Sequence, residues 1–99
     1  MQTVKGKLTY GLEIDGVRHH DFELRLPTLE DMESALEAVP ADSHIARIRR
    51  HIWARCLVRL GTLTSVTADD LAGLAADEYG HFDEAEGALK KKLLTGSAP

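Results

Sequence analysis

The sequence predicts an α+β fold in which an N-terminal antiparallel β-hairpin packs on a bundle of three to four α-helices. Two runs, residues 4–14 and 19–26, alternate apolar and polar side chains with a period of two, as in strands with one covered face. After residue 28 the apolar spacing changes to three and four residues, which is typical of amphipathic helices. Two strands alone are only marginally stable, so the helices must cover the apolar face of the hairpin. We expect one domain over residues 1–95 and a disordered tail over 96–99.

The loop of the hairpin is predicted from the positions of the apolar residues around Asp15-Gly16. A two-residue loop would pair even-numbered positions with odd-numbered ones and place Tyr10 opposite Asp21, whereas an odd-numbered loop pairs the two apolar sets. The sequence therefore predicts a three-residue loop with Gly16 at the positive-φ position of a G1 bulge. The apolar sets are Val4, Leu8, Tyr10, Leu12 and Ile14 in the first strand, and Phe22, Leu24 and Leu26 in the second.

The first helix is expected between two prolines. Pro27 ends the second strand because it cannot donate a hydrogen bond to the ladder. Thr28 is placed to cap the helix, whose first turn carries acids that suit the helix dipole, and Pro40 ends it. Its apolar residues form a narrow face that we expect to pack inward: Leu29, Met32, Leu36 and Val39.

The central helix is expected to run from a cap at Asp42 or Ser43 to about Leu60, with Gly61 as its C-terminal residue. We interpret this helix as the core-forming element on which the other segments pack. Its apolar stripe at helical spacing consists of Ile45, Ile48, Ile52, Cys56 and Leu60, with Trp53 and Leu57 beside it.

Two more helices are expected in the C-terminal third of the chain. Thr67 caps a short helix with Asp69 and Asp70 in its first turn. Its inward residues are expected to be Leu71, Leu74 and Ala75. Asp77 can cap the last helix, whose apolar stripe consists of Tyr79, Phe82, Ala85, Leu89 and Leu93.

Composition excludes several classes of protein. The chain has 99 residues, of which 43% are hydrophobic and 28% charged, near the averages of globular domains. A net charge of −4 is unusual for a dedicated nucleic-acid binder, and a single cysteine excludes an internal disulfide. The N-terminus lacks the apolar run of a signal peptide, and no segment is apolar over the ~20 residues that cross a bilayer. We therefore expect a cytoplasmic protein with no membrane partner.

The central helix carries a basic ridge, because Arg47, His51, Arg55 and Arg59 follow one another at intervals of four. Such a ridge could contact phosphates, which would favour a small nucleic-acid-binding regulator. The alternative is that carboxylates neutralise the arginines, within the domain or on a protein partner. The segments on either side of the helix are acidic, which makes the second interpretation stronger and nucleic-acid binding the weaker one.

Arg49 differs from the other arginines because it falls inside the apolar arc of the helix. A buried unpaired charge is costly, so Arg49 must find a carboxylate or lie at an interface. Asp69, Asp70 and Glu86 are candidate partners. Alternatively, its guanidinium extends past the edge of the core into solvent.

No metal, cofactor or catalytic site is predicted. His19 and His20 are adjacent on a strand and point to opposite faces, and His44 and His51 are two helical turns apart. Cys56 lies on the apolar stripe, where a core thiol is the ordinary interpretation, and its spacing from His51 does not suit a nucleophile and base pair. We therefore expect a non-enzymatic protein.

The order of features resembles one family. A strand pair with Asp15-Gly16 leads into FELRLPTLED, then a helix that ends in RLGTL, and then TADDLAGLAAD. This order is similar to that of the tail assembly chaperones of Mu-like contractile-tailed phages and prophages, also called phage tail protein E. The resemblance covers roughly residues 8–93, and its short apolar and acidic motifs are only moderately specific.

The resemblance implies a non-enzymatic protein that binds the tape measure protein during tail-tube assembly and keeps this long helical partner soluble. It supplies no catalytic residues. Binding to a partner helix would use exposed apolar and charged surface, and the protein could also form a homo-oligomer. The candidate contact residues lie on the central helix and are Arg47, Arg49, Arg50, Trp53, Arg55 and Arg59.

Overall fold

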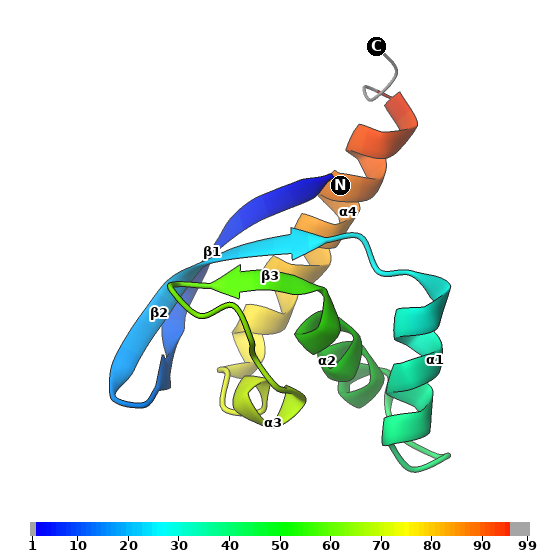
Figure 1. The fold of residues 1–99 in the computed structure, drawn as a ribbon, viewed down its shortest axis with the longest axis horizontal. Helices are drawn as coiled ribbons and strands as arrows, with labels where there is room; N and C mark the ends of the chain where they lie inside the picture. Colours follow the sequence, from blue (N-terminus) through cyan, green and yellow to red (C-terminus); the bar gives the residue numbers. More distant parts are fainter. Residues whose placement is uncertain (1, 96–99) are drawn as a thin grey trace.

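The computed structural model describes residues 2–95 and has an α+β architecture, in which a three-stranded antiparallel sheet is combined with helices (Figure 1). The predicted tail at 96–99 lies outside the described residues. No helix within residues 2–95 has the length and apolar character needed to cross a membrane. The elements, in chain order, are β1 (Thr3–Ile14), β2 (Val17–Arg25), α1 (Leu29–Ala38), α2 (Ile45–Cys56), β3 (Leu57–Leu60), α3 (Ala68–Leu71), the 3₁₀ turn η1 (Ala76–Glu78) and α4 (Tyr79–Thr95).

The hairpin of β1 and β2 has the predicted strands but a different turn. Ile14 pairs with Val17, so the loop is the two residues Asp15 and Gly16, both with positive φ, as in a type I′ turn. The predicted three-residue loop is therefore wrong. The register changes within β1 instead, between Lys7 and Leu12. Because of this irregularity, the even-numbered apolar residues of β1 and β2 are paired with each other at the end of the hairpin away from the turn. The odd-numbered loop was predicted in order to produce this same pairing.

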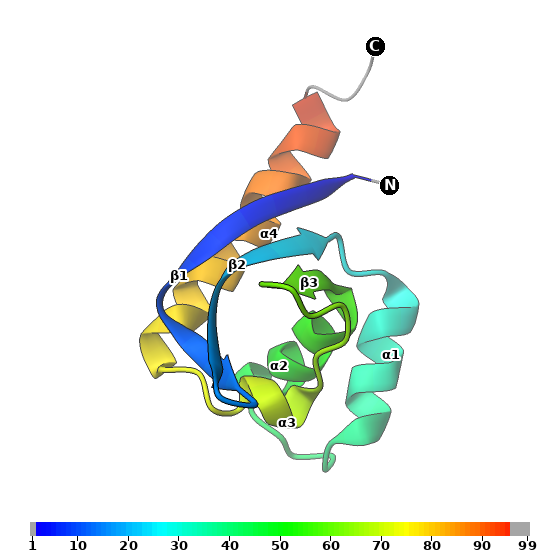
Figure 2. The same cartoon turned by 60° about the vertical axis from the view of Figure 1, so that its left-hand side comes forward.

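The sheet has a third strand that the sequence analysis assigned to a helix. The central helix α2 ends at Cys56, and the next four residues pair with β2 as β3. The predicted helix end at Leu60 is therefore wrong, as are the caps at Asp42 and Ser43, because His44 is the N-cap residue. Gly61 follows β3 with φ 60°, and the hairpin curves around this strand (Figure 2).

Helix α1 is rotated relative to the prediction. Its cap at Thr28 is confirmed, with a complete capping box to Asp31. However, its buried residues are Asp31 and Ala35, and the predicted inward face is exposed at Leu29, Met32 and Leu36. The reason is that Asp31 binds arginines of β2 and α2, which turns the opposite side of the helix outward.

The core lies between the sheet, α2 and α4. Helix α4 packs mainly on β1 and carries the predicted stripe, of which Phe82, Ala85 and Leu89 are buried. Phe22 of β2 contacts Phe82 with ring centroids 4.7 Å apart. The cap of α3 at Thr67 is confirmed, but Asp77 lies inside η1 and does not cap α4.

Candidate functional site

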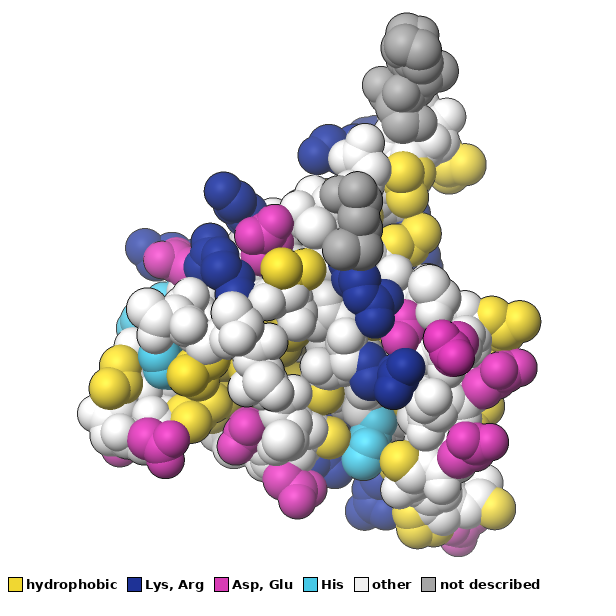
Figure 3. All heavy atoms as spheres, viewed as in Figure 1, with side chains coloured by type: hydrophobic (Ala, Val, Ile, Leu, Met, Phe, Trp, Pro, Cys, Tyr) yellow, Lys and Arg dark blue, Asp and Glu magenta, His cyan; other side chains and the backbone are white. Residues whose placement is uncertain are grey.

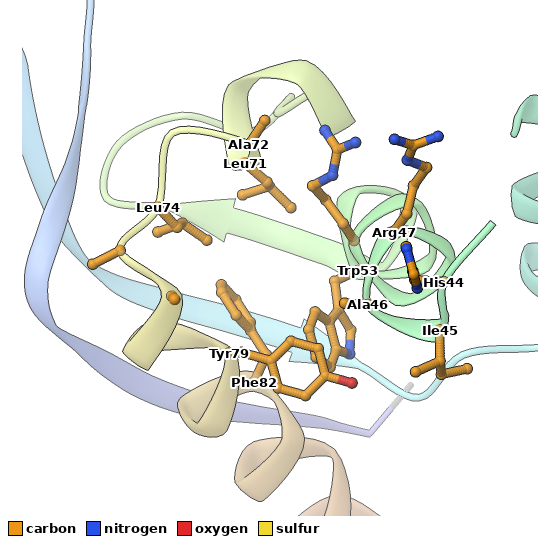
Figure 4. Close-up of a pocket in the computed structure, with 13 residues that line it drawn as sticks. His44, Ile45, Ala46, Arg47, Trp53, Leu71, Ala72, Leu74, Tyr79 and Phe82 are labelled. Atoms are coloured by element: carbon orange, nitrogen blue, oxygen red, sulfur yellow. The ribbon is translucent and has the colours of Figure 1, made fainter.

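A groove of about 810 Å³ lies between α2 on one side and α3, η1 and the start of α4 on the other (Figure 4). Most of its lining is apolar, and α2 also contributes two arginines. The residues that line it are His44, Ile45, Ala46, Arg47, Arg50, Trp53, Leu71, Ala72, Leu74, Ala75, Ala76, Tyr79 and Phe82. An apolar groove of this kind between helices is the form of site that accepts the apolar face of another helix.

Three aromatic rings form the floor of the groove. The Trp53 ring stacks near Phe82 with centroids 5.2 Å apart, and it meets Tyr79 edge-on at 5.0 Å. Trp53 and Phe82 are buried, and Tyr79 is half-buried. The indole Nε1 of Trp53 donates to Glu86 Oε1 at 3.0 Å, so its polar atom is already satisfied within the domain. The floor is therefore held in place by contacts within the domain, and it can make only apolar contacts with a ligand.

Arg49 packs against this aromatic cluster and contacts two of its three rings. Its guanidinium lies 4.5 Å from the centroid of the Trp53 ring, donates to the Tyr79 hydroxyl at 3.1 Å, and forms ion pairs with Asp83 at 2.7 Å and Glu86 at 3.5 Å. Of the predicted partners, Glu86 is confirmed. Asp69 and Asp70 do not pair with Arg49, because the acids that reach it lie on α4.

The environment of Arg49 stabilises its charged form. Burial alone would lower its pKa, but the hydrogen bonds with Asp83 and Tyr79 outweigh this effect and raise the pKa. The pKa of Glu86 is lowered in a similar way, because hydrogen bonds from Trp53 and Lys90 outweigh the effect of its burial. Arg49 thus acts as an internal tie between α2 and α4, and most of its binding capacity is used there.

Arg47 and Arg50 stand at the rim of the groove. Arg50 donates to the carbonyl oxygen of Ala68 at 2.7 Å, which fixes α3 against α2. Arg47 is exposed, and its side chain makes no hydrogen bond or ion pair with other residues in the described part of the chain. The groove is therefore apolar inside and positively charged along its α2 edge.

The basic ridge predicted from the sequence is divided between different environments. Arg55 binds the buried Asp31 at 3.0 Å, and Arg59 pairs with Glu23 at 3.5 Å, so both lie outside the groove. The pKa of His51 is lowered, first by burial and then by the nearby Arg50, so it adds little positive charge at neutral pH. Of the ridge, only Arg47 contributes to the groove.

Two observations on residues 2–95 concern metal binding and the cysteine. Within residues 2–95, no group of three or more histidine, cysteine or acidic side chains is placed to hold a metal ion. Burial, and then the neighbouring Asp31, raise the pKa of the Cys56 thiol to about 12, so the thiol stays protonated.

Arg47, Arg50 and Trp53, on the α2 side of the groove, were predicted as contact residues from the sequence, but the residues of the opposite wall were not. Leu71, Leu74 and Tyr79 were predicted as core residues because helical spacing does not separate the core from a groove wall. A search of protein-family models, curated proteins and solved structures finds no match to this chain.

Proposed function

We propose that this protein is a non-enzymatic phage tail assembly chaperone that binds a helical segment of the tape measure protein in the groove between α2 and α4. The observation that carries the proposal is the groove itself, with an aromatic floor and a basic edge. An amphipathic helix can place its apolar face on Ile45 and Tyr79, which are accessible in the groove, and its acidic side chains beside Arg47. The family resemblance adds the identity of the partner, and the protein would act in the cytoplasm of the host bacterium.

Co-expression with a tape measure protein of a Mu-like phage or prophage tests the proposal. The two proteins should co-purify, and the soluble fraction of the tape measure protein should rise. Failure of both effects would contradict the proposal. Ile45→Glu is the informative variant because Ile45 lines the groove and is 66% exposed, so the substitution places a charge there without disturbing the core.

Val17→Glu is the matched control, because Val17 is also exposed but lies at the hairpin turn, away from the groove. We expect Ile45→Glu to reduce co-purification by about tenfold or more, in line with the loss of an apolar contact at an interface. Val17→Glu should behave like the wild type. Equal effects of the two variants would show that binding does not use the groove.

The nucleic-acid-binding alternative has less support from the geometry. A regulator of that kind would use the whole basic ridge, yet Arg55 and Arg59 are paired with carboxylates of the same chain. It predicts binding to duplex DNA that weakens steeply as salt is added. A titration at low salt distinguishes this alternative from the chaperone proposal.

A further inference from the structure

The outward face of α1 is an apolar stripe that no part of the described chain covers. Leu29, Met32 and Leu36 are 65%, 42% and 48% exposed, respectively. They are spaced by three and four residues, so they lie along one side of the helix. The side that packs on the domain carries Asp31 and Ala35. A stripe of this kind on a helix surface is typical of a contact with another molecule.

An acidic row lies beside this stripe. Glu30, Glu33 and Glu37 are all exposed, and their positions on the helix place them along one flank of the apolar side chains. The space-filling view shows acidic and apolar side chains together over α1 (Figure 3). The outward half of α1 therefore combines an apolar stripe with negative charge.

The groove has the complementary pattern, because its interior is apolar and its α2 edge carries Arg47 and Arg50. No residue of α1 lines the groove, and α1 packs on α2 through its opposite, buried side. The two surfaces therefore cannot meet within one molecule. They can meet when two copies of the chain come together.

We propose that α1 of one copy docks into the groove of a second copy, with Met32 and Leu36 over the aromatic floor and Glu33 and Glu37 beside Arg47. This is a helix-in-groove contact with matched charge. The contact is heterologous, since the two copies use different surfaces: the copy that supplies α1 keeps its groove free, and the copy that supplies the groove keeps its α1 free. Repetition therefore produces a ring if the rotation closes and an open chain if it does not.

The self-association is independent of the partner named above, although both use the groove. A second copy and a partner helix would compete for Trp53 and Arg47, so binding of the partner should dissociate the assembly. If co-expression fails and the purified protein still self-associates, the proposed partner is wrong and the self-association stands. If the purified protein is monomeric but rescues the tape measure protein, the self-association is wrong and the chaperone proposal stands.

Sedimentation velocity of the purified full-length chain over a wide range of concentrations is the first test. The wild type should form species larger than a monomer as concentration rises. Met32→Glu and Arg47→Glu should each weaken association by about tenfold or more, because one removes apolar contact and the other reverses the matched charge. Val17→Glu should associate like the wild type, and circular dichroism should show the same helix content in all variants.

A charge exchange distinguishes this contact from pairing between two α1 helices. Glu33→Arg/Glu37→Arg alone and Arg47→Glu alone should both associate more weakly than the wild type. A mixture of the two should regain association, because the unmodified α1 of one variant fits the unmodified groove of the other and the two reversed surfaces also match in charge. A wild type that is monomeric at every concentration would overturn the proposal. It would also be overturned if Met32→Glu abolished association while Arg47→Glu left it unchanged, since that result indicates contact between the apolar stripes.

Discussion

Two buried carboxylates, Asp31 and Glu78, show two different ways to keep a charge inside this domain. Their exposed fractions are 2% and 0%, respectively. Asp31 accepts hydrogen bonds from the guanidinium of Arg25 at 2.6 and 3.0 Å and from Arg55 at 3.0 Å. Glu78 accepts from the backbone N–H groups of three successive residues of β1, 9 to 11, at 2.9, 2.8 and 3.1 Å.

The difference lies in what each carboxylate organises. Asp31 joins side chains of α1, β2 and α2, and it also completes the cap of α1 through Thr28. Glu78 supports backbone, because the irregular part of β1 leaves N–H groups that β2 does not accept. The partly exposed arginine side chains of an ion pair can rotate towards water when the pair is broken. Backbone N–H groups fixed in a strand cannot turn to another acceptor in this way. We therefore expect the two sites to respond differently to mutation.

Removing the Glu78 carboxylate should have the largest effect. Glu78→Ala leaves three N–H groups without their acceptor, at a cost of about 1–3 kcal/mol for each that water cannot reach. Because parts of this stretch are exposed, we expect a total loss of roughly 3–4 kcal/mol in the free energy of unfolding. Urea denaturation measures this loss. Glu78→Gln keeps one acceptor oxygen and should lose less, and equal losses would contradict the assignment.

Asp31→Ala should have the second largest effect. It removes the ion pairs and the side-chain half of the capping box, but the guanidinium groups of Arg25 and Arg55 are partly exposed and can turn to water. We therefore expect a loss of about 2 kcal/mol, below the cost of breaking a fully buried pair. If Asp31→Ala lost more free energy of unfolding than Glu78→Ala, the ion-pair site would contribute more stability than the backbone site, contrary to our expectation.

Acid should act on the Asp31 site. The guanidinium of Arg25, followed by the N–H of Thr28 and the side chain of Arg55, holds the Asp31 pKa far below its ordinary value of 3.8. The folded-state pKa is depressed, so the stabilisation is complete above the unfolded pKa and is lost as pH falls below it. The wild type should lose stability below about pH 4, and Asp31→Asn should lose less over the same range. If the free energy of unfolding fell equally with pH in the wild type and in Asp31→Asn, the assignment of the acid effect to Asp31 would be wrong.

The glycines of the hairpin should give a smaller effect that separates the turn from the irregular stretch of β1. Gly11 and Gly16 both have positive φ, 80° and 81°. A Cβ at Gly16 would meet open space, so Gly16→Ala should cost about 1 kcal/mol for the backbone alone. At Gly11 the Cβ would lie 2.9 Å from the carbonyl oxygen of His19, so Gly11→Ala should cost about 2 kcal/mol. Thermal unfolding of both variants measures the difference.

Local signals in the sequence were sufficient for most element types and for two of the four predicted N-caps. The first two strands, the capping residues Thr28 and Thr67, and the stripe of the last helix were predicted correctly. Tyr10 was expected on the covered face of the first strand but is 51% exposed, because the register of β1 shifts between Lys7 and Leu12. The correctly predicted features depend on residues within one or two turns of each other. For the same reason, the pairing of Arg49 with Glu86 was predicted only as one of three possibilities, because it joins residues 37 positions apart.

The errors came from contacts that local patterns do not encode. Leu57–Leu60 continues the helical stripe, yet pairing with β2 makes it a strand. The apolar residues of α1 face outward because Asp31, on another side of the helix, binds Arg25 and Arg55, and helical spacing does not show such contacts. The role of Glu78 depends on the irregular stretch of β1, whereas the sequence predicted a bulge at the turn.

Glu78 also protects the exposed edge of the sheet. β1 is an edge strand, and an edge with free N–H groups is a template on which another chain can add a strand and aggregate. Here Lys5 and Lys7 place charge along that strand, and the N–H groups of residues 9–11 are taken by a carboxylate of the same chain. The domain can therefore present apolar surface on its helices to other molecules while its longest strand resists β-sheet addition.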